Sequence, residues 1–162
     1  PEWLWFENHL SYSNSKIPES LFYAYDLTKN KKYLEVAEKS LEFLSQITFE
    51  KYHYTPIGQN GWYFRNKKRS FFDQQPEDTA SMIQTKTVAY KVTGNKDHLE
   101  DAFRAFQWFL GKNHLGQMVY DEVTGGCYDG IGEYALNLNQ GAESTISYLL
   151  ARLALEEFGT TK

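Results

Sequence analysis

Apolar and polar positions along this chain recur with the period of an α-helix, and they predict five helices. Between residues 31 and 46, Tyr33, Ala37, Leu41 and Leu44 lie on one side, with glutamate and lysine on the other. That pattern is typical of an outward-facing amphipathic helix. The remaining helices are predicted over 14–27, 76–92, 96–110 and 140–158.

Capping residues support these boundaries. Asn30 is placed to act as the N-cap of the second helix. Pro76 is a first-turn residue, where its missing N–H is no loss. Gly94 and Gly111 are expected to end the third and fourth helices.

The chain also repeats itself at a shift of 65 residues. Residues 28–31 (Thr-Lys-Asn-Lys) fall on 93–96 (Thr-Gly-Asn-Lys), and Gln74-Gln75 falls on Asn139-Gln140. Asp78 falls on Glu143. Equal spacing of this kind marks supersecondary units that stack to bury a common core. We therefore predict an all-α fold of α/α hairpin repeats, with one domain over residues 1–162.

The predicted connections differ in length on the two sides of the fold. Residues 48–75 and 112–139 form long loops on one side, whereas the turns at 28–30 and 93–95 are short. Long loops at one end of a rigid scaffold are where binding and chemistry usually lie.

The fifth helix has no partner helix within the chain. We therefore expect a fragment of a longer protein, with the open helical edge covered by a missing domain or by a second copy in a homodimer. Between Ile146 and Leu155 the only charged residue is Arg152, so this helix is predicted to be buried on nearly every face.

Three polar clusters occupy comparable places, each before or within the first turn of the first helix of a unit. They are residues 5–14, residues 72–76 and residues 139–143. If these helices line one space, the clusters meet at one end of it. The candidate catalytic residues are then Glu7, Asp73 and Glu143. The candidate substrate-binding residues are Asn8, Tyr12, Trp62, Gln74, Gln75, Tyr128, Asp129, Asn139 and Gln140.

Acids, amides and aromatic rings together suit a polyhydroxylated ligand such as a carbohydrate. Two facing carboxyl groups can hydrolyse a glycosidic bond, and their separation, about 5 Å or about 6.5–9.5 Å, decides between retention and inversion. The alternative is that these acids cap helices and bond neighbouring units, since acids are favoured at helix amino ends anyway. The many rings (4 Trp, 12 Tyr, 11 Phe) likewise serve either core packing or sugar stacking.

Other chemistries have little support in the sequence. The net charge is −4 and the longest basic run is Lys67-Lys68-Arg69, so we expect no nucleic-acid partner. The four histidines are scattered, so we expect no metal and no cofactor. Cys127 is the only cysteine, and an inert thiol is favoured over a nucleophile. No apolar run could cross a membrane, and a cytoplasmic location is expected.

Several motifs occur in order along the chain: Trp-Phe-Glu-x-x-Leu-Ser-Tyr (5–12), Pro-Ile-Gly and Gly-Trp-Tyr (56–63), Phe-Asp-Gln-Gln-Pro (72–76), Thr-Gly-Gly-Cys-x-Asp-Gly (124–130) and Asn-Gln-Gly-Ala-Glu-Ser-Thr (139–145). Together they resemble a helical-hairpin domain of bacterial and archaeal proteins, often the C-terminal part of glycosyltransferases. That domain is similar in architecture to the α/α toroids of six-hairpin glycosidases and sugar epimerases.

The resemblance implies part of an α/α toroid, about half of a closed ring, and a set of residues at its mouth. These are Glu7, Asp73, Gln74, Gln75, Asp129, Gln140 and Glu143. The resulting expectation is a carbohydrate-active domain, binding or processing glycans, associated with a glycosyltransferase or a glycosidase-like protein. The alternative is a non-catalytic structural or interaction module of a glycosyltransferase.

Overall fold

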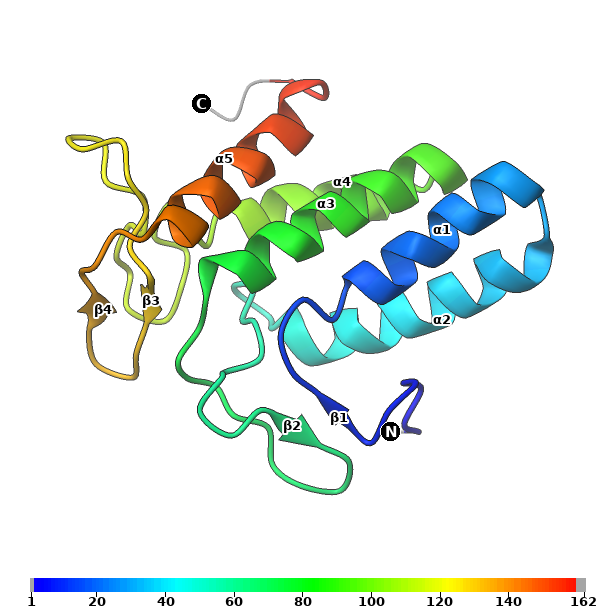
Figure 1. Cartoon of the computed structure of the whole chain (residues 1–162), viewed down its shortest axis with the longest axis horizontal. Helices are drawn as coiled ribbons and strands as arrows, with labels where there is room; N and C mark the ends of the chain where they lie inside the picture. The colour runs from blue at the N-terminus through cyan, green and yellow to red at the C-terminus, as the bar shows by residue number, and fades with distance from the viewer. Residues whose placement is uncertain (1, 160–162) are drawn as a thin grey trace.

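Five helices and two short pairs of strands make up the fold (Figure 1). The computed structural model describes residues 2–159. In chain order the elements are β1 (His9–Leu10), α1 (Lys16–Thr28), α2 (Lys31–Thr48), β2 (Tyr63–Phe64), α3 (Pro76–Thr93), α4 (Lys96–Phe106), β3 (Gly130–Ile131), β4 (Leu136–Asn137) and α5 (Ala142–Glu156). The prediction of an all-α fold with five main helices is confirmed.

Helices α1, α3 and α5 lie side by side, with their amino ends on the same side of the molecule (Figure 1). Helix α2 packs on α1, and α4 packs on α3 and, less extensively, on α5. The first helix of each unit therefore forms an inner row, and the second helix lies outside it. We call the side with the amino ends of α1, α3 and α5, and the long loops there, the amino-end face.

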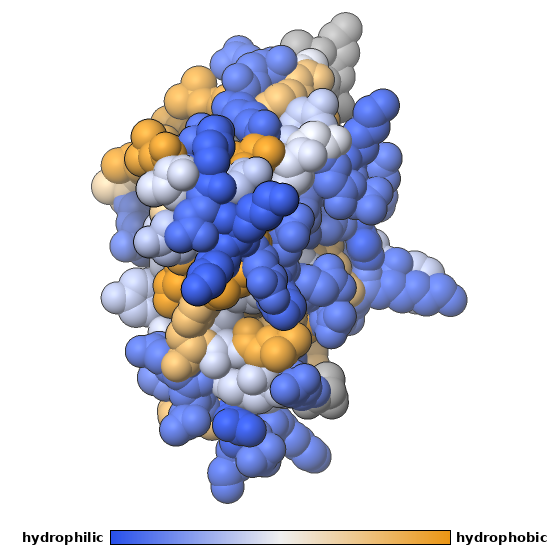
Figure 2. Space-filling model, turned by 90° about the vertical axis from the view of Figure 1, so that its right-hand side faces the viewer, coloured by the Kyte–Doolittle hydropathy of each residue, from blue (hydrophilic) through white to orange (hydrophobic). Residues whose placement is uncertain are grey.

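The opposite side, the short-turn end, shows the repeat in its hydrogen bonds. The hydroxyls of Thr28 and Thr93 each donate to the carbonyl four residues earlier, at 2.7 Å. The side-chain oxygens of Asn30 and Asn95 then cap α2 and α4 by accepting the N–H two residues later, at 3.1 and 3.0 Å. The predicted cap at Asn30 is confirmed. This end of the molecule is mostly hydrophilic, with hydrophobic atoms in separate patches (Figure 2).

Lys29 and Gly94 occupy the same position in the two turns. Both have left-handed backbones, with φ of 56° and 73°, and both donate their N–H to the carbonyl four residues earlier at 2.7 Å. Gly94 ends α3 as predicted. Helix α4 instead ends at Phe106, and residues 107–111 continue in tight turns closed by bonds from residue i to residue i−3, so Gly111 ends this extension rather than the helix.

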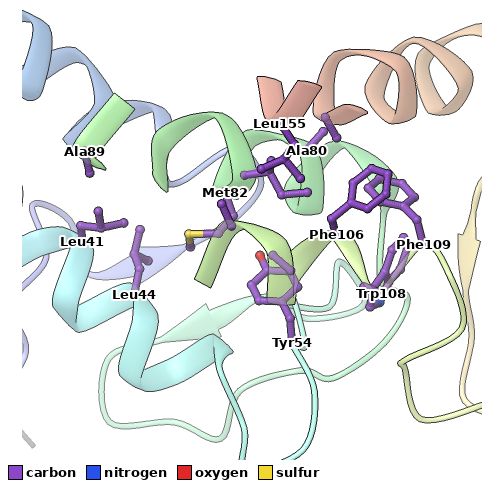
Figure 3. Packing of buried hydrophobic residues seen from close by; sticks show 14 of the residues in the cluster. Leu41, Leu44, Tyr54, Ala80, Met82, Ala89, Phe106, Trp108, Phe109 and Leu155 are labelled. Carbon is purple, nitrogen blue, oxygen red and sulfur yellow. The ribbon is translucent and has the colours of Figure 1, made fainter. Parts of the chain in front are cut away.

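The core lies between the inner and outer rows. Figure 3 shows Leu41 and Leu44 of α2 near Met82 of α3, and the rings of Phe106 and Phe109 gathered at the α4 end. Helix α3, at the centre of the fold, buries most of its apolar residues and most of its threonines and serines. Most of these polar side chains are hydrogen-bonded, either to carbonyls of α3 itself, as the Thr85 and Thr87 hydroxyls are, or across helices, as the Ser15 and Ser81 hydroxyls are at 3.1 Å.

Helix α5 corrects one prediction. It is not buried on nearly every face: Ile146, Leu149, Leu150 and Leu153 are 46–61% exposed. The reason is that α5 is the last of the row, so α3 and α4 cover one side of it and nothing within residues 2–159 covers the other. None of the helices in the described part of the chain combines the length and the apolar character needed to cross a bilayer.

The long loops gather at the amino-end face. In the first unit β1 pairs with β2, with His9 opposite Phe64, and in the second Gln74 bridges to Ile131. The loop before α3 is fixed from inside by Arg69, whose guanidinium donates to the carbonyls of Ile47, Thr55 and Pro56. The β1–β2 pairing thus joins the segment before α1 to the loop after α2, and the Gln74–Ile131 bridge joins the segment before α3 to the loop after α4.

Candidate functional site

The end of the first polar cluster meets the first turn of α3, which directly follows the second cluster. The Ser13 N–H donates to Oδ1 of Asp78 at 2.8 Å, and the Ser13 hydroxyl donates to Glu77. Ser13 has a φ of 51°, a left-handed conformation that costs a non-glycine residue about 1 kcal/mol. Its two bonds to the acids of α3 offset that cost and fix the entry of α1 against α3.

Glu77 and Asp78 are consecutive acids in the first turn of α3, and their environments differ. Asp78 is 6% exposed, and its Oδ2 has no hydrogen-bond partner among the described residues. Burial and the charge of Glu77 raise the pKa of Asp78 well above its usual value, against the effect of the Ser13 N–H. Burial therefore works against the charged form of the Asp78 carboxyl group.

Glu77 lies nearer the surface. Its partial burial and the charge of Glu143 raise the pKa of Glu77, although Lys16 and the Ser13 N–H work in the other direction. Glu143, in the first turn of α5, is exposed. The structure thus brings the amino ends of α3 and α5 close enough for their carboxyl groups to interact.

A polar pocket of about 210 Å³ lies between the two long loops of the amino-end face. Its lining residues are Gln59, Asp73, Asp129, Gly130, Gly132, Ala135, Leu136 and Asn137. Two of the predicted site residues, Asp73 and Asp129, therefore share one pocket, although they are 56 positions apart in the sequence.

Asp129 fastens the loop to the start of α5. Its Oδ1 accepts the Gly141 N–H and the Ser144 hydroxyl, both at 2.7 Å, and its Oδ2 accepts from the Asn139 amide. Burial acts to raise the pKa of Asp129, but the three donors outweigh it and lower the pKa. A Cβ at Gly141 would come within 2.9 Å of Oδ1, so this close approach needs glycine.

Gln74 is buried inside the fold. Its Oε1 accepts the indole N–H of Trp108 at 2.7 Å, and its Nε2 donates to the Phe71 carbonyl at 3.1 Å. The side chain is 2% exposed, so these bonds join the loop before α3 to the turns after α4. Gln75 follows as the half-buried residue before α3.

Gln140 and Tyr128 converge on Asp121 in the second long loop. The Gln140 amide donates to Oδ2 of Asp121 at 3.0 Å and accepts from Thr124 at 2.8 Å. The Tyr128 hydroxyl lies 3.3 Å from the same Oδ2. Hydrogen bonds from the Val123 N–H and from Gln140 lower the pKa of Asp121, which keeps this acceptor charged.

The remaining predicted residues lie on the side of the amino-end face formed by the first unit. Tyr12 is 62% exposed, and its ring centroid is 6.2 Å from that of Trp62. Glu7 and Asn8 are exposed just before β1, and Asn8 lines a different pocket, beside β2. The structure therefore brings Asp73 and Asp129 into one pocket, with Asn139 bonded to Asp129. It places Glu143 near enough to Glu77 to raise the pKa of Glu77, and it leaves Glu7 and Asn8 with the first unit.

Cys127 is fully buried, and burial together with the charge of Asp129 raises the pKa of its thiol to about 12. A thiol in that state is a poor nucleophile. Within residues 2–159 no group of three or more His, Cys, Asp or Glu side chains has a metal-binding arrangement.

Comparison with solved structures identifies the class of fold. The chain is similar to the family 76 glycoside hydrolase (mannosidase) Bt3792 from Bacteroides thetaiotaomicron, with a TM-score of 0.67 and 15% identity over 89% of this chain and 38% of that one. It is also similar to an inactive variant of the α-1,6-mannanase GH76A of Salegentibacter in complex with α-1,6-mannotriose, with a TM-score of 0.68 and 18% identity over 94% and 42%.

A family 76 glycoside hydrolase from a bovine Bacteroides thetaiotaomicron strain gives a TM-score of 0.69 at 16% identity, over 91% of this chain and 31% of that one. The fold is thus part of an α/α toroid of the glycosidase kind, and the chain spans about two fifths or less of the length of these hydrolases. The sequence itself matches no model of a protein family and no curated protein.

From the sequence, Asp78 could belong either to the carboxylates around the shared space or to the helix cap, with the cap favoured. Glu77 suited only the amino end of its helix, and neither Ser13 nor Asp121 was selected as a site residue. One signal for the acids was present, because the 65-residue shift that aligns Asp78 with Glu143 also aligns Ser13 with Asp78. Those three positions lie at the amino ends of α1, α3 and α5, so the repeat indicated which residues would lie on the same face.

Proposed function

We propose that this chain is a carbohydrate-active domain in which a saccharide lies across the amino-end face. The observation that carries the proposal is that α1, α3 and α5 present their amino ends, with acids, amides and rings, on one side of the molecule. A solved protein of similar fold, the Salegentibacter mannanase variant, holds α-1,6-mannotriose.

Glu77 and Glu143 are the carboxyl groups best suited to act on a glycosidic bond. A general acid needs a raised pKa, which partial burial and the neighbouring charge of Glu143 give Glu77. Glu143, exposed on the next helix, would then be the base or nucleophile. The mannanase complex has an inactivating change of two consecutive aspartates, and Glu77 and Asp78 are the consecutive acids in the first turn of α3.

Asp73 and Glu7 remain further candidates in the proposal. Asp73 lines the polar pocket with Asp129, where Gln59 and Asn137 could bond sugar hydroxyls. Glu7 lies further along the surface beside β1, so it would meet only an extended glycan. Trp62 and Tyr12 would form the stacking platform between these two regions.

The test is turnover and binding of α-1,6-linked manno-oligosaccharides and of a broad glycan array, by product analysis and calorimetry. Glu77→Gln and Glu143→Gln should each lower turnover at least about 100-fold while binding persists, because each removes an acid–base or nucleophilic group. Glu100→Gln, on the exposed side of α4, is the matched control. Turnover that survives Glu143→Gln unchanged would remove Glu143 from this role.

A second function, a non-catalytic module of a glycosyltransferase or related protein, is favoured by the exposed apolar face of α5. Ile146, Leu149, Leu150 and Leu153 recur at helical spacing on that face. Another helical domain or a second copy could cover it and leave the amino-end face to hold a glycan. Glycan binding with no turnover of any bound glycan would favour this function over the first.

A further inference from the structure

The hairpin around β2 carries basic side chains that the amino-end site does not use. Arg65, Asn66 and Lys67 form its tip, at the bottom of Figure 1, on a chain whose net charge is −4. All three are exposed, and neither Arg65 nor Lys67 forms an ion pair with any acid of residues 2–159. An isolated group of free cations on an acidic protein attracts anions locally.

Two pockets lie on either side of Arg65. One, of about 440 Å³, is lined by Asn8, Phe64, Arg65, Asn66 and Lys67. The other, of about 410 Å³, is lined by Glu2, Trp3, Phe43, Ile47, Tyr63, Arg65 and Asn66. Both volumes are within the range of small-ligand sites, and Arg65 and Asn66 belong to both pockets.

The second pocket adds an aromatic wall. The Trp3 ring lies 5.2 Å from Phe43 and 5.3 Å from Tyr63, both in edge-on contact, and its indole N–H donates to the Glu7 carbonyl at 2.7 Å. These contacts hold the ring in place. A fixed indole beside a guanidinium provides an apolar face for a ring and a planar donor for an anion.

The hairpin is held firmly enough to present these groups. The Arg65 N–H donates to the Asn8 carbonyl at 2.8 Å, and the Lys67 N–H closes the turn onto the Phe64 carbonyl at 2.9 Å. Asn66 adopts the left-handed conformation that the turn requires, with a φ of 64°. Arg69, at the base, is engaged with backbone carbonyls and is not available to a ligand.

We propose that the two pockets beside Arg65 bind an anionic saccharide. The phosphate or carboxylate group lies between Arg65 and Lys67, and the sugar ring lies against Trp3 and Tyr63. Glu2, at the rim, restricts the anion to the Lys67 side of Arg65. This site is separate from the acids of α3 and α5, so it does not depend on the proposed catalytic pair.

The test is calorimetric titration of the whole chain with glucose 6-phosphate, galacturonate, neutral glucose and uridine monophosphate. The two charged sugars should bind, and comparison of the two distinguishes a phosphate from a carboxylate ligand. Binding of either should weaken as salt is added. Equal binding of neutral glucose, tighter binding of uridine monophosphate, or no binding of either charged sugar would overturn the proposal.

Arg65→Gln should weaken the binding of the charged sugar at least tenfold, and Lys67→Gln should weaken it several-fold. Lys31→Gln removes an exposed cation at the short-turn end and should change nothing. Equal losses in Arg65→Gln and Lys31→Gln would show a non-specific charge effect and contradict the site. Glu143→Gln should leave this binding intact, so failure here and failure of the catalytic proposal are distinguishable.

Discussion

The two ends of the helical rows are built in different ways. At the short-turn end, Thr28 and Asn30 satisfy the backbone within a few residues, and Thr93 and Asn95 repeat the same bonds one unit later. At the amino-end face, Asp78 bonds Ser13 across 65 positions, and one of its oxygens is left without a partner among residues 2–159. The short-turn end is thus stabilised by hydrogen bonds between near neighbours in the sequence. The amino-end face instead holds a buried carboxyl group at a cost in stability, which is typical of functional sites.

The largest effect should come from Gln74→Leu, at the amino-end face. The change leaves the buried indole N–H of Trp108 without its acceptor, so the free energy of unfolding should fall by about 3 kcal/mol, as measured by urea denaturation. Gln75→Leu, at the half-buried next position, should stay within about 0.5 kcal/mol of the parent. Similar losses in the two variants would show that Gln74 does not act through this bond.

Asp78→Asn should stabilise the protein by about 2 kcal/mol at neutral pH, because the amide keeps the acceptor for the Ser13 N–H and removes a carboxyl group whose ionisation is opposed by burial. The pKa of Asp78 is raised in the folded state, so its folded form retains a proton that the unfolded chain loses above the usual value of 3.8. The cost of the native aspartate therefore grows as the pH rises from that value toward the folded pKa.

The advantage of Asp78→Asn should accordingly be small in acid and reach its full size at neutral pH, when urea denaturation is measured across that range. An advantage independent of pH would contradict the assignment of a raised pKa to Asp78. The same variant, assayed on a glycan substrate, would also show whether this buried carboxyl supports Glu77.

At the short-turn end, Asn30→Ala and Asn95→Ala should each cost about 1 kcal/mol, because each removes one side-chain cap. The two losses should be equal, since the caps have the same geometry, and additive, since they belong to different turns. Thermal unfolding of the two single variants and the double variant measures both properties. Unequal losses would show that the two caps, although alike in geometry, do not contribute equally to stability.

The smallest effect is expected from Lys29→Gly, which should stabilise by about 0.5 kcal/mol because glycine relieves the left-handed backbone. The exposed ion pair with Asp26 that it removes contributes little. Gly94→Ala is the reverse change in the other turn. The added methyl group would meet no atom within 4 Å, so the left-handed backbone alone should destabilise this variant, by about 1 kcal/mol. Thermal unfolding of both variants measures the two changes, and shifts of the same sign would contradict this account.

The sequence predicted the short-turn end more fully than the amino-end face. Caps, stops and the 65-residue repeat are local signals, so Asn30 and Gly94 could be assigned from neighbouring residues alone. The helix length after Phe106 and the exposure of α5 were missed, because tight turns and missing neighbours leave no mark on apolar periodicity. Hydropathy reports which residues are apolar, not what lies beside them.

The site was predictable only as a set of clusters. That the inner helices would share one side followed from the repeat, but the partners within that side did not. Gln74 bonding Trp108, and Asp129 bonding the start of α5, depend on how two loops fold over each other. Side-chain pairings between distant loops have no periodic signal in the sequence.

The partly buried guanidinium of Arg69 has a consequence for how the loop before α3 tolerates change. Its donors hold carbonyls from the end of α2 and from residues 55 and 56, so one planar cation organises a stretch with almost no regular structure. A lysine, with a single ammonium, could not bridge the same set. Insertions and substitutions should therefore be tolerated mainly at the hairpin tip, residues 65–67. There, ligand preference can change without weakening the packing of the helices.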